Sequence, residues 1–223
     1  MAATSSLCYV SSWTNESEEL IPMWREYASV ESGVRISLTT SPFKWVADTT
    51  RPTVSTDSVF STTGTYNTRM SVADQLAQGV VCFTAAESNI LYEVEYTNDM
   101  NKLSPAIRVS DNRFALQLLG KYKPKAWRYQ KEWRYIHLAI PGAMINTPNA
   151  PTVYLDQLKM QLGGKMPMNM PDYLDFPLSD DAMHDMEITL APKINAGFKL
   201  LVYDLVEKYC PLATIRESSL ELA

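Results

Sequence analysis

Short runs in which apolar and polar residues alternate recur along most of the chain, a pattern typical of β-strands with one buried face. The two clearest runs are residues 34–38, where Val34, Ile36 and Leu38 alternate, and residues 132–140. A proline follows each run, and proline cannot continue a central strand. By the same reasoning we predict further strands over residues 7–13, 80–84, 90–96, 186–190 and 213–215.

Four other segments space their apolar residues as a helix does. They cover residues 20–27, 72–78, 111–119 and 195–209. Polar residues ahead of three of them can cap the helix N-terminus: Asn15 or Ser17 for the first, Ser71 for the second, and Ser110 or Asp111 for the third. Because Pro211 has no N–H to donate, we expect the last helix to end before it.

Together these elements predict one α+β domain over residues 1–223, with a mostly antiparallel mixed sheet and flanking helices. A chain of 223 residues that is 46% hydrophobic can bury a sizeable core. Residues 49–68 are rich in Ser and Thr and poor in aliphatic side chains, so we expect an exposed loop or hairpin there. The Pro- and Met-rich residues 141–171 give no clear pattern, although residues 152–162 fit a strand or a helix.

Composition excludes several classes of function. The net charge of -5 argues against general adhesion to nucleic acid or anionic membranes, because the field of the protein repels phosphates at long range. Cys8, Cys82 and Cys210 are odd in number and widely spaced, which indicates reduced thiols rather than a disulfide framework. With His137 and His184 as the only histidines, neither a zinc site nor a serine triad is expected. No apolar run approaches the roughly 20 residues that span a bilayer, and we expect a soluble, cytoplasmic protein without a signal peptide.

The segment from Lys121 to Tyr135, KYKPKAWRYQKEWRY, has the most unusual composition, with six cationic side chains, many aromatic rings and one acid. In a strand that begins near Tyr129, the side chains of Gln130, Glu132 and Arg134 would share one face. A carboxylate beside a guanidinium forms a charge-assisted pair that keeps the acid ionised. Two interpretations remain open: a site that binds a ribose hydroxyl or a positive centre, and an ion-paired edge strand over packed aromatics.

A second candidate is the pair Trp24 and Tyr27 on the first predicted helix. Three residues apart, they lie on one face and offer flat rings for stacking, although such pairs more often fill a core. A third pattern, residues 60–63 with residues 93–95, mimics the Ser-Thr-Ser and Glu-x-Glu elements of some ADP-ribosyltransferases. We interpret this third match as chance, because short motifs without their strand context are frequent.

Four segments in order resemble a bacterial and phage family known as domain of unknown function two-nine-seven-one. They are MWREYASVESGVRI at residues 23–36, Val-x-Tyr at residues 94–96, Lys125 with Trp-x-Tyr-x-x-Glu-Trp-Arg at residues 127–134, and a Glu-Ile strand, turn and helix at residues 187–209. Members usually begin with a His-Tyr segment and an Asn-Asp-Pro turn, so this chain resembles a shortened member. The usual Glu-x-Glu of the third segment is Gln130, Lys131 and Glu132 here.

The family has no agreed activity, but its layout is similar to ADP-ribosyltransferase-like folds, which use NAD. Under this likeness Glu132 would accept the ribose 2'-hydroxyl of NAD and stabilise an oxocarbenium-like transition state. Gln130 would position the acceptor, and Arg134 would hold Glu132 or a phosphate. The implied cofactor-binding residues are Trp24, Tyr27, Lys125 and Trp127, with the ring of Trp24 or Tyr27 stacked on nicotinamide.

Three classes of function follow. The first is a NAD- or nucleotide-binding ADP-ribosyltransferase-like enzyme that acts in phage–host conflict, or a catalytically silent descendant of one. The second is a binding module that recognises an acidic peptide or a nucleotide without turnover. The third is a virion-associated structural protein that buries the Ser/Thr-rich residues or residues 160–170 against neighbouring chains.

Overall fold

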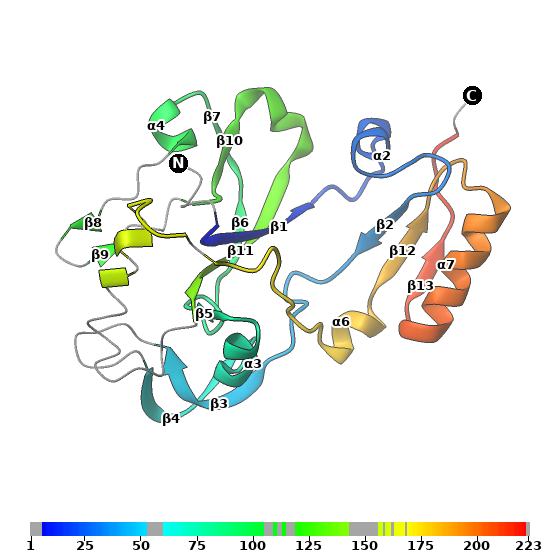
Figure 1. The fold of residues 1–223 in the computed structure, drawn as a ribbon. Helices are drawn as coiled ribbons and strands as arrows, with labels where there is room; N and C mark the ends of the chain where they lie inside the picture. Colours follow the sequence, from blue (N-terminus) through cyan, green and yellow to red (C-terminus); the bar gives the residue numbers. More distant parts are fainter. Residues whose placement is uncertain are drawn as a thin grey trace. The chain divides into compact units, whose positions relative to one another are not determined.

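A computed structural model of the chain describes residues 6–52, 60–104, 109–110, 113–114, 119–142, 156–157, 159–161, 163–167 and 169–221. The fold is α+β with mostly antiparallel strand pairs, as the sequence predicted. Contacts group the chain into two compact units, coloured by sequence in Figure 1. Unit 1 comprises residues 1–15 and 45–176, and unit 2 comprises residues 16–44 and 177–223. A single folding domain over the whole chain stays a prediction.

Strand β11 (Glu132–Pro141) is the centre of the main sheet of unit 1. It pairs antiparallel with β1 (Cys8–Thr14) on one side, and with β6 (Leu91–Glu93) and β5 (Val80–Cys82) on the other. The strands predicted over residues 7–13, 80–84 and 132–140 are therefore confirmed.

The two faces of this sheet differ because successive side chains of a strand point to opposite sides. Ala139 belongs to an apolar core with Met70, Val80 and Cys82, and Phe176 packs on this core. Glu132 and Arg134 belong to the other set of alternating positions, so the polar pair of β11 faces away from that core.

Short elements surround the main sheet of unit 1. They are β3 (Val46–Pro52), β4 (Phe60–Thr68), α3 (Val72–Ala77), β7 (Glu95–Thr97), α4 (Met100–Leu103), β8 (Val109–Ser110), β9 (Arg113–Phe114), β10 (Tyr122–Pro124) and the 3-10 helix η1 (Lys125–Gln130). Strands β3 and β4 form the hairpin expected at residues 49–68. Ser71 caps α3 as predicted, because its hydroxyl accepts the N–H of Asp74 at 3.1 Å.

Three local predictions for unit 1 need correction. The strand predicted over residues 90–96 divides at Val94, because the chain leaves β11 there and β7 pairs in parallel with β10. The helix predicted over residues 111–119 lies largely outside the described residues, and Arg113–Phe114 form strand β9 instead. The strand predicted to begin near Tyr129 begins at Glu132, because η1 occupies the preceding residues. Of residues 152–162, the described residues 156–157 and 159–161 are helical.

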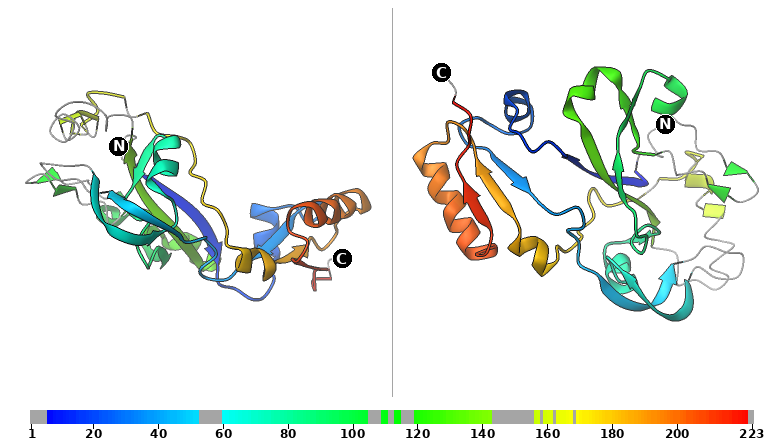
Figure 2. Two further views of the ribbon diagram at one scale, coloured as in Figure 1. Left: turned by 90° about the horizontal axis from the view of Figure 1, so that it is seen from below. Right: turned by 180° about the vertical axis from the view of Figure 1, so that it is seen from behind.

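Unit 2 is a three-stranded sheet covered by one long helix (Figure 2). The strand order is β13 (Thr214–Arg216), β12 (Glu187–Leu190), β2 (Val34–Ser37), and α7 (Ala196–Tyr209) packs its Val206 against Met186 and Ile188. Two shorter helices, α2 (Ile21–Tyr27) and α6 (Asp180–His184), complete it. The helices predicted over residues 20–27 and 195–209 and the strands predicted over residues 34–38, 186–190 and 213–215 are confirmed, whereas α6 was not predicted. The cap predicted for α2 was wrong: Leu20 occupies that position, without a side-chain cap.

Candidate functional site

The carboxylate of Glu132, at the start of β11, binds a cation with each oxygen. Lys123 Nζ donates to Oε2 at 2.7 Å, and Arg134 Nε donates to Oε1 at 2.7 Å. Burial alone would raise the pKa of Glu132, but hydrogen bonds from Arg134, Lys123 and Ser12 lower it to about 2. Glu132 is therefore ionised at neutral pH and held in one direction.

Lys123 links this ion pair to η1. Its ammonium also donates to the side-chain oxygen of Gln130, which is buried at the end of η1. Arg134 Nη1 donates to the carbonyl oxygen of Gly120 at 2.6 Å, so the chain just before β10 is held as well. The predicted residues Gln130, Glu132 and Arg134 thus lie together, although Gln130 belongs to a 3-10 helix rather than to their strand.

Sequence reasoning did not select Lys123, which joins these residues. Pro124 favours an extended backbone at Lys123 and was a usable signal. The position of Lys123 beside Glu132 also depends on the parallel pairing of β10 with β7, and local sequence does not reveal that pairing.

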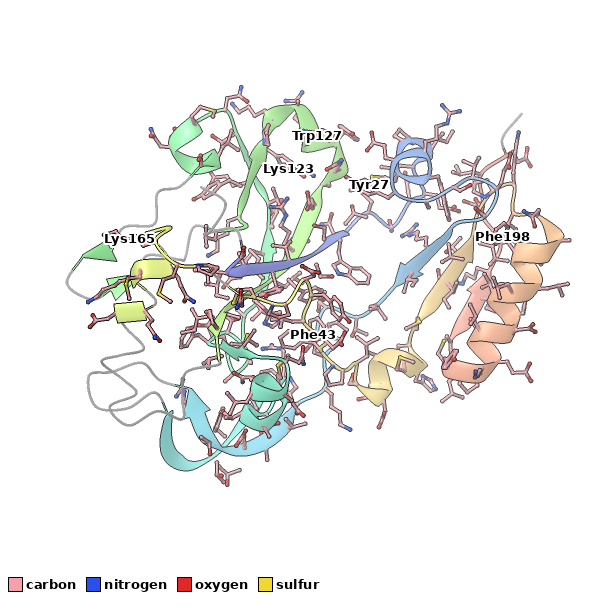
Figure 3. All side chains as sticks on the ribbon, in the orientation of Figure 1. Tyr27, Phe43, Lys123, Trp127, Lys165 and Phe198 are labelled. Carbon is pink, nitrogen blue, oxygen red and sulfur yellow. The ribbon has the colours of Figure 1, made fainter. Side chains whose placement is uncertain are left out.

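Besides Ala126, the outer surface of η1 carries the exposed side chains of Lys125, Trp127, Arg128 and Tyr129, and we call these four the η1 surface. Trp127 is 42% and Tyr129 is 40% exposed, and their ring centroids lie 6.3 Å apart. Lys123 Nζ lies 5.3 Å from the centroid of the Trp127 ring (Figure 3). Among the residues that the structure describes, no acidic side chain forms an ion pair with Lys125 or Arg128. The exposed aromatic rings and the cations Lys125 and Arg128 therefore lie together on η1.

The turn after η1 fixes the direction of this surface. Lys131 adopts a left-handed conformation with φ 42°, and its N–H donates to the carbonyl oxygen of Arg128 at 3.3 Å. The N–H of Glu132 donates to the hydroxyl of Tyr96 at 2.8 Å. The backbone that leads from η1 into β11 is thus held on both sides of the turn.

The family model described as "Protein of unknown function (DUF2971)" matches residues 23–135. This chain belongs to the DUF2971 family. The match spans half of the chain and includes most of α2, all of η1 and the start of β11, so it confirms the resemblance seen in the sequence. No curated protein and no solved structure matches the sequence significantly.

Within the DUF2971 match, the remaining predicted residues Trp24 and Tyr27 lie on α2 in unit 2. Trp24 is only 4% exposed, and its indole N–H donates to Glu19 at 3.0 Å, as expected for a residue that packs in a core. Tyr27 is 61% exposed. Only Tyr27 of this pair therefore offers a large ring surface to solvent.

A buried cluster surrounds His137, two residues beyond the end of the DUF2971 match. The sequence did not predict this cluster as part of the site. His137 Nδ1 lies 3.3 Å from Thr84 Oγ1 and 3.8 Å from Cys82 Sγ, and the ring stacks on Phe176. Burial and the charge of Arg69 lower the pKa of His137 to about 3, and burial raises the pKa of Cys82 to about 11. Both groups are therefore neutral at pH 7, which favours a structural role over nucleophilic chemistry.

Neither a metal site nor a membrane-spanning helix is found in the described part of the chain. No group of three or more His, Cys, Asp or Glu side chains there is placed to hold a metal ion. No helix of the described residues is long and apolar enough to cross a membrane.

Proposed function

We propose that the η1 surface of unit 1 is a recognition site for a ligand that combines a flat ring with phosphate, as a nucleotide does. The observation that carries this proposal is the exposure of Trp127 and Tyr129 beside Lys125 and Arg128 on one rigidly held turn. The ligand would be bound without turnover.

Each part of such a ligand has a matching group. Bases stack on aromatic side chains, and one base stacked in this way contributes about 1–3 kcal/mol. The planar guanidinium of Arg128 can bind two phosphate oxygens at once, and Lys125 adds a point charge. An acidic peptide would use the cations but offers no flat ring to stack on Trp127, so a nucleotide fits the surface better.

In this proposal Glu132 supports the surface and does not touch the ligand. Its ion pair with Lys123 joins β10 to β11, and η1 connects these two strands. Arg134, on the same strand as Glu132, holds the second carboxylate oxygen. Binding residues that are held in place before the ligand arrives lose less conformational entropy when it binds.

Calorimetric titration with ADP and with an acidic peptide tests the proposal. We expect ADP to bind more tightly than the peptide, and Trp127→Ala to weaken ADP binding at least about fivefold because one stacked ring is lost. Lys208→Ala, which removes an exposed cation from α7 in unit 2, is the matched control and should have no effect. Equal ADP affinity for Trp127→Ala and the unaltered chain would overturn the proposal.

A second candidate function is ADP-ribosyl transfer from NAD to a protein target, in the setting of phage–host conflict. Support comes from Glu132, which is ionised as a catalytic carboxylate must be, and from Gln130 two residues before it. Both oxygens of Glu132 already accept hydrogen bonds from cations, so one of them must exchange that bond for the ribose hydroxyl.

Release of nicotinamide from labelled NAD distinguishes the two functions. The transferase predicts release that is lost in Glu132→Gln, whereas the binding module predicts none from either protein. ADP binding that is lost in Trp127→Ala, together with absence of nicotinamide release, would reject the transferase and leave the binding module.

A further inference from the structure

Strand β1 is an edge strand of the main sheet of unit 1 that lacks the usual protection. Among the described residues, it pairs on one side only, with β11. Natural edge strands are usually short, bulged, or marked by proline or charged residues that prevent pairing with other chains. The seven residues of β1, CYVSSWT, include no charge and no proline, and Val10, Ser11 and Ser12 are exposed.

The register of β1 on β11 shows which main-chain groups point to the open edge. The carbonyl oxygen of Leu7 accepts the N–H of Ala139 at 3.0 Å, so odd-numbered residues of this strand bond to β11. In antiparallel pairs such bonding alternates from residue to residue. The N–H and C=O groups of Val10 and Ser12 therefore point outward.

We propose that a second copy of this chain adds its own β1 antiparallel to this edge, on a two-fold axis that passes through Ser11. In this register Val10 of one copy lies opposite Ser12 of the other, so outward-facing groups meet outward-facing groups in both copies. Tyr9, whose ring packs on the core of unit 1, lies opposite Trp13 of the second copy.

A second copy fits this edge better than an unrelated peptide for two reasons. A two-fold interface uses the same surface twice, and in this register the outward groups of Val10 meet those of Ser12 in both copies. The strand is also neutral, so two copies approach without repulsion between like charges at the edge.

Light scattering of purified chain tests the proposal, because it measures the mass in solution. We expect a dimer for the unaltered chain and for the control Ser11→Thr. Ser11→Lys and Ser11→Asp should each be monomeric, since the axis places two like charges opposite each other. An equal mixture of these two variants should again form dimers. The proposal is overturned if the unaltered chain is monomeric, as expected if the edge binds a foreign peptide. It is also overturned if the mixture of Ser11→Lys and Ser11→Asp stays monomeric.

A disulfide checks the register independently of stability. Ser11 and its symmetry mate would form a non-hydrogen-bonded pair with Cα atoms about 4.5 Å apart, a distance that a disulfide can bridge. We expect Ser11→Cys to give a covalent dimer on mild oxidation. Ser12→Cys should not, because the register sets Ser12 opposite Val10. Equal cross-linking of both variants would reject the axis at Ser11.

Discussion

At the scale of single residues, the two ion pairs of Glu132 make the stability of the protein depend on pH. The pKa of this carboxyl falls from an ordinary 4.5 to about 2 in the folded chain. A lowered pKa contributes stability that is complete above pH 4.5 and is lost as the pH falls toward 2. In the folded chain Lys123 and Arg134 keep their ionised partner until the pH approaches 2, whereas the unfolded chain protonates Glu132 near pH 4.5.

We therefore expect Glu132→Gln to lower the free energy of unfolding at pH 7 by about 3 kcal/mol, because it leaves two largely buried cations without a countercharge. The same variant should flatten the loss of stability below pH 4.5. Urea unfolding at a series of pH values measures both effects. Glu93→Gln, at an exposed position of β6, is the control and should change the free energy by less than about 0.5 kcal/mol.

His137 should affect the free energy of unfolding in a different pH range. Its pKa falls from 6.5 to about 3 on folding, so between these values the unfolded chain binds a proton that the folded chain does not bind. Stability is then lost as the pH falls from 6.5 toward 3, by up to about 1.4 kcal/mol per pH unit. His137→Gln should remove this slope. Unfolding measured between pH 6.5 and 5 isolates His137, because Glu132 does not titrate there; an unchanged slope would contradict its burial as a neutral ring.

Gly120 combines a left-handed backbone with tight packing. Its φ is +76°, and an added Cβ would lie 3.0 Å from Cys8 Sγ and 3.3 Å from Val10 Cγ2. Gly79 has the same φ, but nothing lies within 4 Å of an added Cβ. Gly79→Ala should therefore cost about 1–2 kcal/mol of unfolding free energy through its backbone alone. Gly120→Ala should cost more, as thermal unfolding would show; equal losses would mean that the neighbours of Gly120 yield freely.

At the scale of elements, the sequence predicted what local chemistry determines. The alternation in β11, the Ser71 cap of α3 and the spacing of α7 are local signals, and each of these elements was found. The 3-10 helix η1 is present in the structure but was not predicted, because aromatic residues next to Glu132 favour a strand. Lys131 adopts the left-handed conformation that separates η1 from β11. The sequence does not signal this turn, because left-handed turns are usually marked by glycine or asparagine and not by lysine.

The element-scale prediction concerns Lys123, which links β10, η1 and β11. Lys123→Met removes hydrogen bonds to Gln130 and Glu132. Because hydrogen bonds to charged groups contribute about 1.5–3 kcal/mol, we expect a loss of that size and faster proteolysis within η1. Lys121→Met is a matched control: its ammonium lies 4.1 Å from the Tyr92 ring centroid, a contact between two half-buried side chains that contributes about 1 kcal/mol. Equal losses would contradict the bridging role of Lys123.

At the scale of the whole molecule, the predicted site residues divide between the two units. Gln130, Glu132 and Arg134 were predicted from strand alternation and do lie together, in unit 1. The ring-bearing pair on α2 belongs to unit 2. Helical spacing predicted one shared face for that pair, and the helix was found, but the ring of Trp24 is buried and that of Tyr27 is exposed. Spacing alone does not distinguish these two environments.

The central claim is that the η1 surface binds the ring of a nucleotide with Trp127 and its phosphate with Arg128. The most direct measurement compares the affinities of adenosine and ADP for the unaltered chain, Trp127→Ala and Arg128→Ala. We predict that Trp127→Ala weakens both ligands by a similar factor, and that Arg128→Ala weakens ADP while adenosine is unaffected. Affinities that are the same for all three proteins, or absence of ADP binding to the unaltered chain, would contradict the claim.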